Sequence, residues 1–156
     1  MKISKAERRD LPHILAIQKE AYRSEAVLYD DFSIPPLQQS LKEIEAEFES
    51  KVFLKAEIDG LLVGSVRVAL AGLTCLVGRL IVDPKFQRRG IGSALLLEAE
   101  SVFPEAVRFE LFTGSRSQAN IRLYERHGYV RFREEALSPA VTLTYLQKIK
   151  AVNQTA

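Results

Sequence analysis

The chain has 156 residues, of which 47% are hydrophobic and 27% charged, and its formal net charge at pH 7 is +2. These values are typical of one soluble globular domain, which we place at residues 1–150, with a frayed tail at residues 151–156. One cysteine excludes an intrachain disulfide and a cysteine-built zinc site, and no apolar run reaches the roughly 18–20 residues that span a bilayer.

The same counts argue against several classes of partner. The histidines, His13 and His127, belong to unrelated segments, so no metal site is expected. The small net charge gives no reason to expect a nucleic-acid partner, and no segment suggests a membrane partner. Cys75 in an apolar run and the lack of a secretory signal fit a reducing, cytoplasmic compartment.

The first third of the chain predicts a strand and two helices. Residues 2–7 favour a short strand, and Asp10 can cap a helix that runs to about Tyr22. Residues 23–38 are less regular. A second helix is expected over residues 37–50, because its apolar side chains recur at spacings of four, three and four.

The apolar period then changes to two, which indicates strands. Residues 52–58 and 61–70 predict a hairpin closed by Asp59-Gly60. Gly64 inside the second strand indicates a bulge or a close backbone approach. Residues 73–82 predict the next strand.

The remaining elements alternate between helix and strand. The sequence predicts a helix at residues 90–103, a strand at 107–113, a helix at 118–127 capped by Ser117 and closed by Gly128, and strands at 129–133 and 141–147. The order is β-α-α-β-β-β-α-β-α-β-β, an α/β fold with a mixed, mostly antiparallel sheet flanked by helices.

A glycine-bearing turn between a strand and a helix predicts an anion site. The apolar strand residues Leu80, Ile81 and Val82 end at Asp83-Pro84, and an apolar helix follows the turn. Unpaired N–H groups in the first helical turn and the partial positive charge of the helix end favour a phosphate there. The residues of this turn are Gln87, Arg88, Arg89, Gly90, Ile91, Gly92 and Ser93. The structural alternative is a tight turn with a basic surface patch.

A second motif covers residues 117–129. Asn120 and Tyr124 are four residues apart, so they lie on one face of the predicted helix. For Tyr124 taken alone, the alternative is an aromatic side chain that packs under the sheet.

Together, the two motifs resemble the acetyl-CoA motif of the GNAT superfamily of N-acetyltransferases, and the resemblance covers nearly the whole chain. It implies that the backbone of the turn binds the CoA pyrophosphate and that the strand at Leu80–Val82 pairs with the pantetheine arm and directs an N–H at the thioester carbonyl. It implies that Asn120 contacts the pantetheine or the phosphates and that the Tyr124 hydroxyl faces the CoA sulfur. The implied reaction is direct attack by a primary amine on the acetyl-CoA thioester.

The general base is less clear. Some members of the family carry a glutamate on the strand before the turn, but residues 73–80 contain no carboxylate. Glu110, on the next strand, is the nearest match to the other known position, although it lies farther from Asn120 than that pattern places it. Thr113 can occupy the position instead. A solvated strand residue is the alternative reading of Glu110, and deprotonation through water is a third route.

The resemblance places residues 23–38 across the acceptor cleft. This segment and the residue before it carry the side chains Tyr22, Glu25, Tyr29, Asp30, Asp31 and Phe32. They could bind a cationic amine by charge and cation–π contact; alternatively, the acids cap helix ends and the aromatic side chains fill the core. Polyamines, amino acids, aminoglycoside-like amines and protein N-termini all remain open, as does the homodimer common in the family. Two other functions are considered. One is a non-catalytic sensor that binds acyl-CoA, and the other is a nucleic-acid-binding module that would use arginines scattered over several elements.

Overall fold

The computed structural model describes residues 1–151, which form one seven-stranded sheet with helices on both faces. The strand order is β1-β2-β3-β4-β5-β7-β6, and every neighbouring pair is antiparallel except β4 and β5. The strands are β1 (Lys2–Lys5), β2 (Val52–Ile58), β3 (Leu61–Ala71), β4 (Thr74–Val82), β5 (Arg108–Gly114), β6 (Val130–Ala136) and β7 (Thr142–Ile149). The helices are α1 (Leu11–Tyr29), α2 (Pro35–Gln38), α3 (Leu41–Phe48), α4 (Ile91–Ala99) and α5 (Gln118–Arg126), with 3₁₀ turns at Arg8–Asp10 and Pro84–Phe86.

The predicted fold class is confirmed; α4 ends at Ala99, before the predicted residue 103, β6 continues to Ala136, and the larger differences lie in the N-terminal helices. Helix α1 continues to Tyr29, seven residues beyond the predicted end, because Ala26 and Tyr29 are buried against Ile34 and Val141. The second predicted helix is divided into α2 and α3. Ser40 separates them as the N-cap of α3, with a reciprocal capping box to Glu43 that the sequence analysis did not identify.

Two predicted caps act differently. The Asp10 carboxylate accepts from the Glu7 N–H at 2.7 Å and from Lys55 at 3.0 Å, instead of capping α1. The Ser117 hydroxyl donates to Glu25 instead of capping α5.

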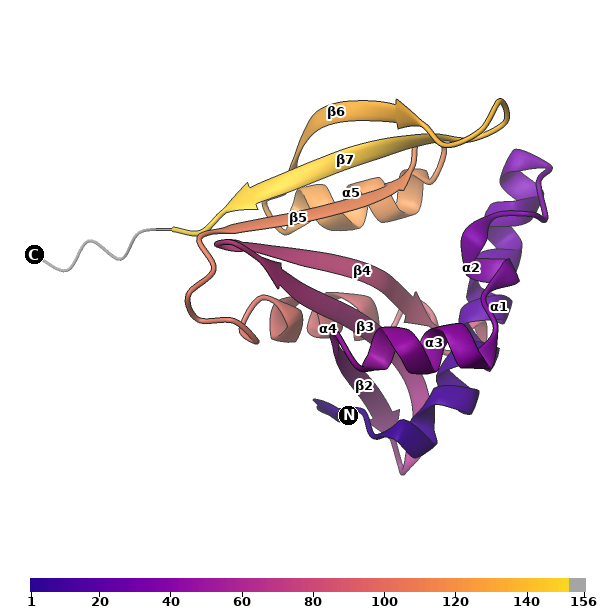
Figure 1. Cartoon of the computed structure of the whole chain (residues 1–156), viewed down its shortest axis with the longest axis vertical. Helices are drawn as coiled ribbons and strands as arrows, with labels where there is room; N and C mark the ends of the chain where they lie inside the picture. The colour runs from indigo at the N-terminus through magenta and orange to yellow at the C-terminus, as the bar shows by residue number, and fades with distance from the viewer. Residues whose placement is uncertain (152–156) are drawn as a thin grey trace, which may run out of the picture.

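Two apolar layers cover the two faces of the sheet. Helix α4 packs on β2, β3 and β4, and its buried Leu95 and Leu96 share a core with Tyr124 of α5. On the other face, α1 and α3 bury Ile14 and Ile44 against the sheet. Figure 1 shows α3 crossing the sheet opposite α4. No helix within residues 1–151 combines the length and the apolar character needed to cross a membrane.

The sheet opens between β4 and β5. The two strands pair only at Thr74–Leu76 against Arg108–Glu110 and then diverge, as Figure 1 shows. The register of β4 against β3 shifts between Ser65 and Arg67, and Arg79 opposite this shift has a left-handed φ of 51°. The predicted close approach at Gly64 is confirmed, because a Cβ there would lie 2.9 Å from the Ile81 carbonyl oxygen.

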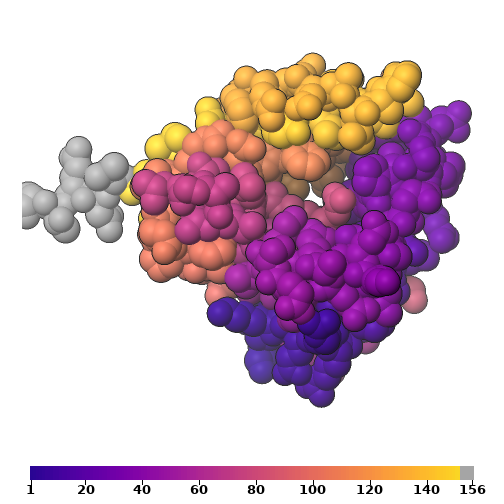
Figure 2. All heavy atoms as spheres, in the orientation of Figure 1, coloured from indigo at the N-terminus to yellow at the C-terminus, as the bar shows by residue number. Residues whose placement is uncertain are grey.

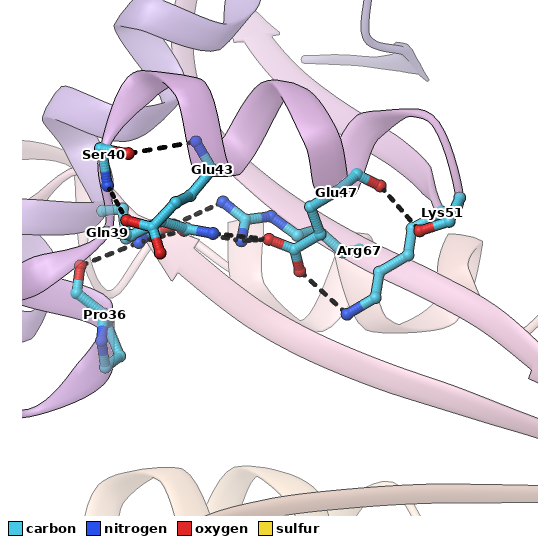
Figure 3. Close-up of polar contacts among 9 residues, drawn as sticks. Pro36, Gln39, Ser40, Glu43, Glu47, Lys51 and Arg67 are labelled. Atoms are coloured by element: carbon cyan, nitrogen blue, oxygen red, sulfur yellow. Dashed lines mark hydrogen bonds and ion pairs between the residues drawn. The ribbon is translucent and has the colours of Figure 1, made fainter.

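A buried arginine joins the N-terminal helices to the sheet (Figure 3). Arg67 of β3 is 1% exposed, and its guanidinium donates to Glu47 of α3 at 2.8 Å and to Gln18 of α1 at 2.5 Å. The amide of Gln18 in turn donates to the Pro36 carbonyl of α2 at 2.9 Å. Burial lowers the pKa of Arg67 to about 10, so the guanidinium stays charged near neutral pH.

Candidate functional site

A cavity of about 680 Å³ occupies the opening between β4 and β5. Its walls come from α1, α2, β4, the loop before α4, the C-terminal half of β5, α5 and β7. Figure 2 shows the surface hollowed between the purple N-terminal helices and the orange-to-yellow C-terminal hairpin. The parallel strands separate where this cavity begins, so the fold itself creates the site.

Most residues of the two sequence motifs line this cavity. They are Leu80, Ile81, Val82, Gln87, Arg88, Gly90, Ile91, Gly92, Ser93, Asn120 and Tyr124. Arg89 and Glu110 are not among the lining residues. The Arg89 guanidinium lies 5.1 Å from the centre of the Phe86 ring.

The turn before α4 has the backbone of an anion site. Arg88 and Gly90 have left-handed φ values of 65° and 76°, and Gly90 is the N-cap of α4. The N–H groups of the first helical turn therefore have no intrahelical acceptor, and Ile91, Gly92 and Ser93 of this turn line the cavity. His127 fixes this turn, because its Nε2 lies 3.0 Å from the Ser93 hydroxyl.

Arg126, the residue before His127, also lines the cavity. It adds a second arginine to Arg88 on the wall, and sequence reasoning missed it because nothing in the α5 sequence marks which arginine faces the cavity. The anion end therefore combines backbone donors with two guanidinium groups.

The edge of β4 that faces the opening offers backbone donors. Beyond Leu76, β4 has no partner on its β5 side. The Asp83 N–H donates to the Val63 carbonyl at 2.8 Å, and successive N–H groups along a strand point to opposite sides. The Val82 N–H therefore points away from β3, toward the cavity.

Tyr124 and Asn120 extend from α5 into the same cavity. Tyr124 is 6% exposed, and its pKa is raised above the usual value by burial and, to a lesser degree, by Tyr22 and Glu25. The Asn120 side chain donates to the Thr113 hydroxyl at 3.4 Å, and Thr113 itself lines the cavity. Because its pKa is raised, Tyr124 remains a neutral hydroxyl that can donate a hydrogen bond.

Glu110 lies where the sheet is still closed. It pairs with Leu76 of β4 and Gln147 of β7, before the strands diverge, and it does not line this cavity. Its carboxylate accepts from Arg108 at 2.8 Å. Glu110 is therefore a strand residue whose carboxylate is paired with Arg108.

The predicted acceptor segment divides into two groups. Tyr22, Glu25 and Tyr29 line the cavity, whereas Asp30, Asp31 and Phe32 do not. The Tyr29 hydroxyl accepts from the Arg116 N–H at 2.6 Å and lies against Gly114, where a Cβ would collide with it. This contact attaches the end of α1 to the end of β5, so α1 closes one side of the cavity.

Comparison with known proteins identifies the family. The family model of the acetyltransferase (GNAT) domain matches residues 49–131, more than half of the chain. The UPF0157 protein YqkA of Bacillus subtilis is 31% identical over 116 residues, which make up 74% of this chain. The chain spans about a third of the length of that relative, since the match covers 33% of it.

Solved structures show the same fold at low identity. The PaiA N-acetyltransferase of Thermoplasma acidophilum, in complex with coenzyme A, has a TM-score of 0.78 at 18% identity, over 96% of this chain and 98% of that one. The ribosomal-protein-S18-alanine N-acetyltransferase of Escherichia coli has a TM-score of 0.77 at 20% identity, over 99% and 97%. YncA of Salmonella typhimurium, with its cofactor acetyl-CoA, has a TM-score of 0.74 at 20% identity, over 100% and 99%. The match of the family model over the strands and the turn that form the cavity shows that the chain belongs to the GNAT acetyltransferase family.

Proposed function

We propose that the protein is an N-acetyltransferase that transfers the acetyl group of acetyl-CoA to a primary amine. One observation carries the proposal: a single cavity joins a glycine-bearing anion site at the start of α4 to a split in the sheet. This shape suits a long ligand with a phosphate group at one end and a reactive group at the other. Neighbours of the same fold hold coenzyme A or acetyl-CoA.

The cofactor would lie along the motif residues. The N–H groups of the turn from Gln87 to Ser93, with Arg88, would bind the pyrophosphate. The pantetheine arm would pair with the free edge of β4 at Leu80–Val82, beside Asn120. The Val82 N–H, which points away from β3, is the donor that we assign to the thioester carbonyl oxygen in the transition state.

The reaction needs a neutral amine and a stabilised leaving group. A lysine-like amine of pKa about 10.4 is only ~0.1% neutral near pH 7.4, which costs about 4 kcal/mol unless a base removes the proton. The C–N bond forms as the neutral nitrogen attacks the carbonyl, and the C–S bond then breaks. A second proton from the nitrogen neutralises the CoA thiolate.

Tyr124 is assigned to the sulfur as a hydrogen-bond donor. A tyrosine with a raised pKa is a much weaker acid than a thiol of pKa about 8.5, so full proton transfer from Tyr124 would be uphill. A hydrogen bond to the departing thiolate has no such penalty. Glu110 has no part in this mechanism, because its carboxylate pairs with Arg108 outside the cavity.

The test is release of free CoA thiol from acetyl-CoA across a panel of amines, with desulfo-CoA binding measured by calorimetry as the control. The panel contains polyamines, amino acids, aminoglycosides and peptides with free N-termini. We expect turnover with one class of amine. Desulfo-CoA binding without turnover on any member would overturn the transferase proposal and favour an acyl-CoA sensor.

A further inference from the structure

The acceptor end of the cavity contains two opposite charges. Among the side chains within residues 1–151 that line the cavity, Glu25 carries the one carboxylate. Arg79 lines the same cavity from β4, and both residues act electrostatically on Tyr22. Arg88 and Arg126, the other lining arginines, belong to the anion end, so Arg79 has no role in the cofactor assignment.

Arg79 has an unusual backbone conformation on the wall of the cavity. Its backbone has a left-handed φ of 51° at the register shift between β4 and β3. A non-glycine residue keeps such a conformation only where the surrounding structure imposes it, and such residues concentrate at functional sites. The guanidinium carbon lies 5.9 Å from the centre of the Tyr22 ring, and the Arg79 Nε, like that of Arg67, is buried without a hydrogen-bond partner within residues 1–151. Unlike Arg67, Arg79 lines the cavity, so its charge favours an anionic group on a ligand there.

Glu25 is fixed on the wall of the cavity that α1 forms. It follows Tyr22 by one turn of α1, and its carboxylate accepts from the buried Ser117 hydroxyl. Its charge contributes to the raised pKa values of Tyr22 and Tyr124, and all three side chains line the same cavity. Glu25 therefore shares the cavity with the residue assigned to the CoA sulfur, where an attacking amine must also lie.

Much of the remaining wall is apolar, although Ser24, Thr113 and Tyr145 add hydroxyl groups to it. The apolar part is formed by Ile34 and Pro36 beside α1, and by Val141 and Leu143 of the C-terminal segment. Ile34 and Val141 pack in one buried cluster with Tyr29. Such walls suit an apolar substituent and penalise a second cation or a sugar hydroxyl without a partner.

We propose that the acceptor is a small zwitterion, an α-amino acid with an apolar side chain, whose carboxylate binds Arg79 and whose amine faces Glu25. The inference rests on the proposed transferase function and names its substrate class. Glu25 takes one proton from the substrate ammonium and passes it to solvent. The neutral nitrogen then forms the C–N bond, and its second proton goes to the CoA sulfur as the C–S bond breaks.

Other acceptors fit the same charges less well. A peptide N-terminus carries a neutral amide in place of the carboxylate, and its carbonyl oxygen would accept only a weaker hydrogen bond from Arg79. A polyamine would bring a second positive charge toward Arg79. The free carboxylate of an amino acid satisfies Arg79 by a charge-assisted hydrogen bond.

The first experiment compares matched acceptors in the CoA-release assay. For leucine, methionine and phenylalanine, the free amino acid is measured beside its carboxamide and its decarboxylated amine. We expect kcat/KM for the acid to exceed those of both analogues by about 10- to 100-fold, the range for a hydrogen bond between charged groups. Equal or faster turnover of the carboxamides, the amines or a polyamine would overturn the zwitterion proposal while leaving the transferase function in place. No turnover of any acceptor, with desulfo-CoA still bound, would instead overturn the proposed function.

The second experiment tests the proposed roles of Arg79 and Glu25 by substitution. Arg79→Gln should lower kcat/KM for the amino acid by about 10- to 100-fold but leave that for the decarboxylated amine within about threefold, because only the acid contacts Arg79. Glu25→Gln should lower turnover near neutral pH, with the rate recovering as rising pH deprotonates the amine in solution. Arg131→Gln, on the exposed strand β6, is the matched control. It should change neither kcat/KM for the amino acid nor that for the decarboxylated amine. An equal loss for acid and amine in Arg79→Gln would contradict the assignment.

Discussion

The Tyr124 hydroxyl lies in a setting that keeps it protonated. Burial raises its pKa, and the neighbouring Tyr22 and Glu25 act in the same direction. Because a phenolate is disfavoured there, the hydroxyl can support a departing thiolate only by donating a hydrogen bond. Its contribution should therefore appear in the chemical step and be constant across neutral pH.

Replacing Tyr124 with Phe tests this role. We expect kcat to fall by about 10- to 100-fold, the effect of losing one hydrogen bond to a charged group, while KM for acetyl-CoA changes by less than about threefold. Steady-state kinetics at pH 7 and 9 give both values. Tyr129→Phe is the control, because Tyr129 donates to Glu100 at 2.8 Å outside the cavity. An unchanged kcat in Tyr124→Phe would end the assignment.

Contiguous motifs could be identified from the sequence, whereas the acceptor end could not. The turn at Gln87–Ser93 and the pair Asn120 and Tyr124 each belong to one local segment, so helix and turn rules predict a common face. The orientation of Arg79 depends on a register shift against β3, which no local pattern in β4 announces. Glu25 was identified among several acids, but its position in the cavity depends on the longer α1 and on Ser117.

At the scale of elements, three helices depend on one buried cation. Arg67 contacts Glu47 of α3, and its amide partner Gln18 holds the α2 carbonyl of Pro36, which lines the cavity. Since removing one partner of a buried pair leaves the other uncompensated, the α1–α3 layer should respond as a unit. The sequence predicted these helices from their periodicity but not their attachment, because a lone Arg in a strand gives no indication of its partners.

The carboxylate of Glu47 should make this layer sensitive to acid. Burial alone would raise its pKa, but Lys51, Arg67 and Gln39 together lower it below the usual value of 4.5. The folded state thus binds fewer protons than the unfolded state, so the stabilisation is present above about pH 4.5 and is lost as pH falls through the folded pKa.

Glu47→Gln should therefore reduce the free energy of unfolding by about 1.5–3 kcal/mol at pH 7, the range for a hydrogen bond to a charged group. The difference from the parent chain should shrink toward pH 3. Urea unfolding at several pH values measures it. Glu45→Gln serves as the control, because Glu45 is on the same helix but exposed, 3.6 Å from Arg8. A difference that stays constant between pH 7 and pH 3 would contradict the linkage.

At the scale of the whole molecule, the cavity separates two parts of one sheet. Within the sheet, β1–β4 connect to β5–β7 through three residue pairs between β4 and β5, and the end of α1 and the shared core of α4 and α5 join the two parts outside it. A ligand in the opening would contact both parts at once. It should therefore stabilise the whole fold, not only the turn that binds its phosphates.

Coenzyme A should consequently raise the melting temperature. A ligand at 100 times its Kd adds about 2.7 kcal/mol, which for a domain near 150 residues corresponds to roughly 5–10 °C. Differential scanning fluorimetry with CoA and with desulfo-CoA measures this shift, and we expect the two ligands to act alike. Arg88→Gln should reduce the shift and its sensitivity to added salt, since one phosphate contact is lost. Arg131→Gln, on the exposed strand β6 and not among the residues that line the cavity, should leave both unchanged. Millimolar CoA without any shift, or a shift that Arg88→Gln does not alter, would contradict the placement of the phosphates at the start of α4.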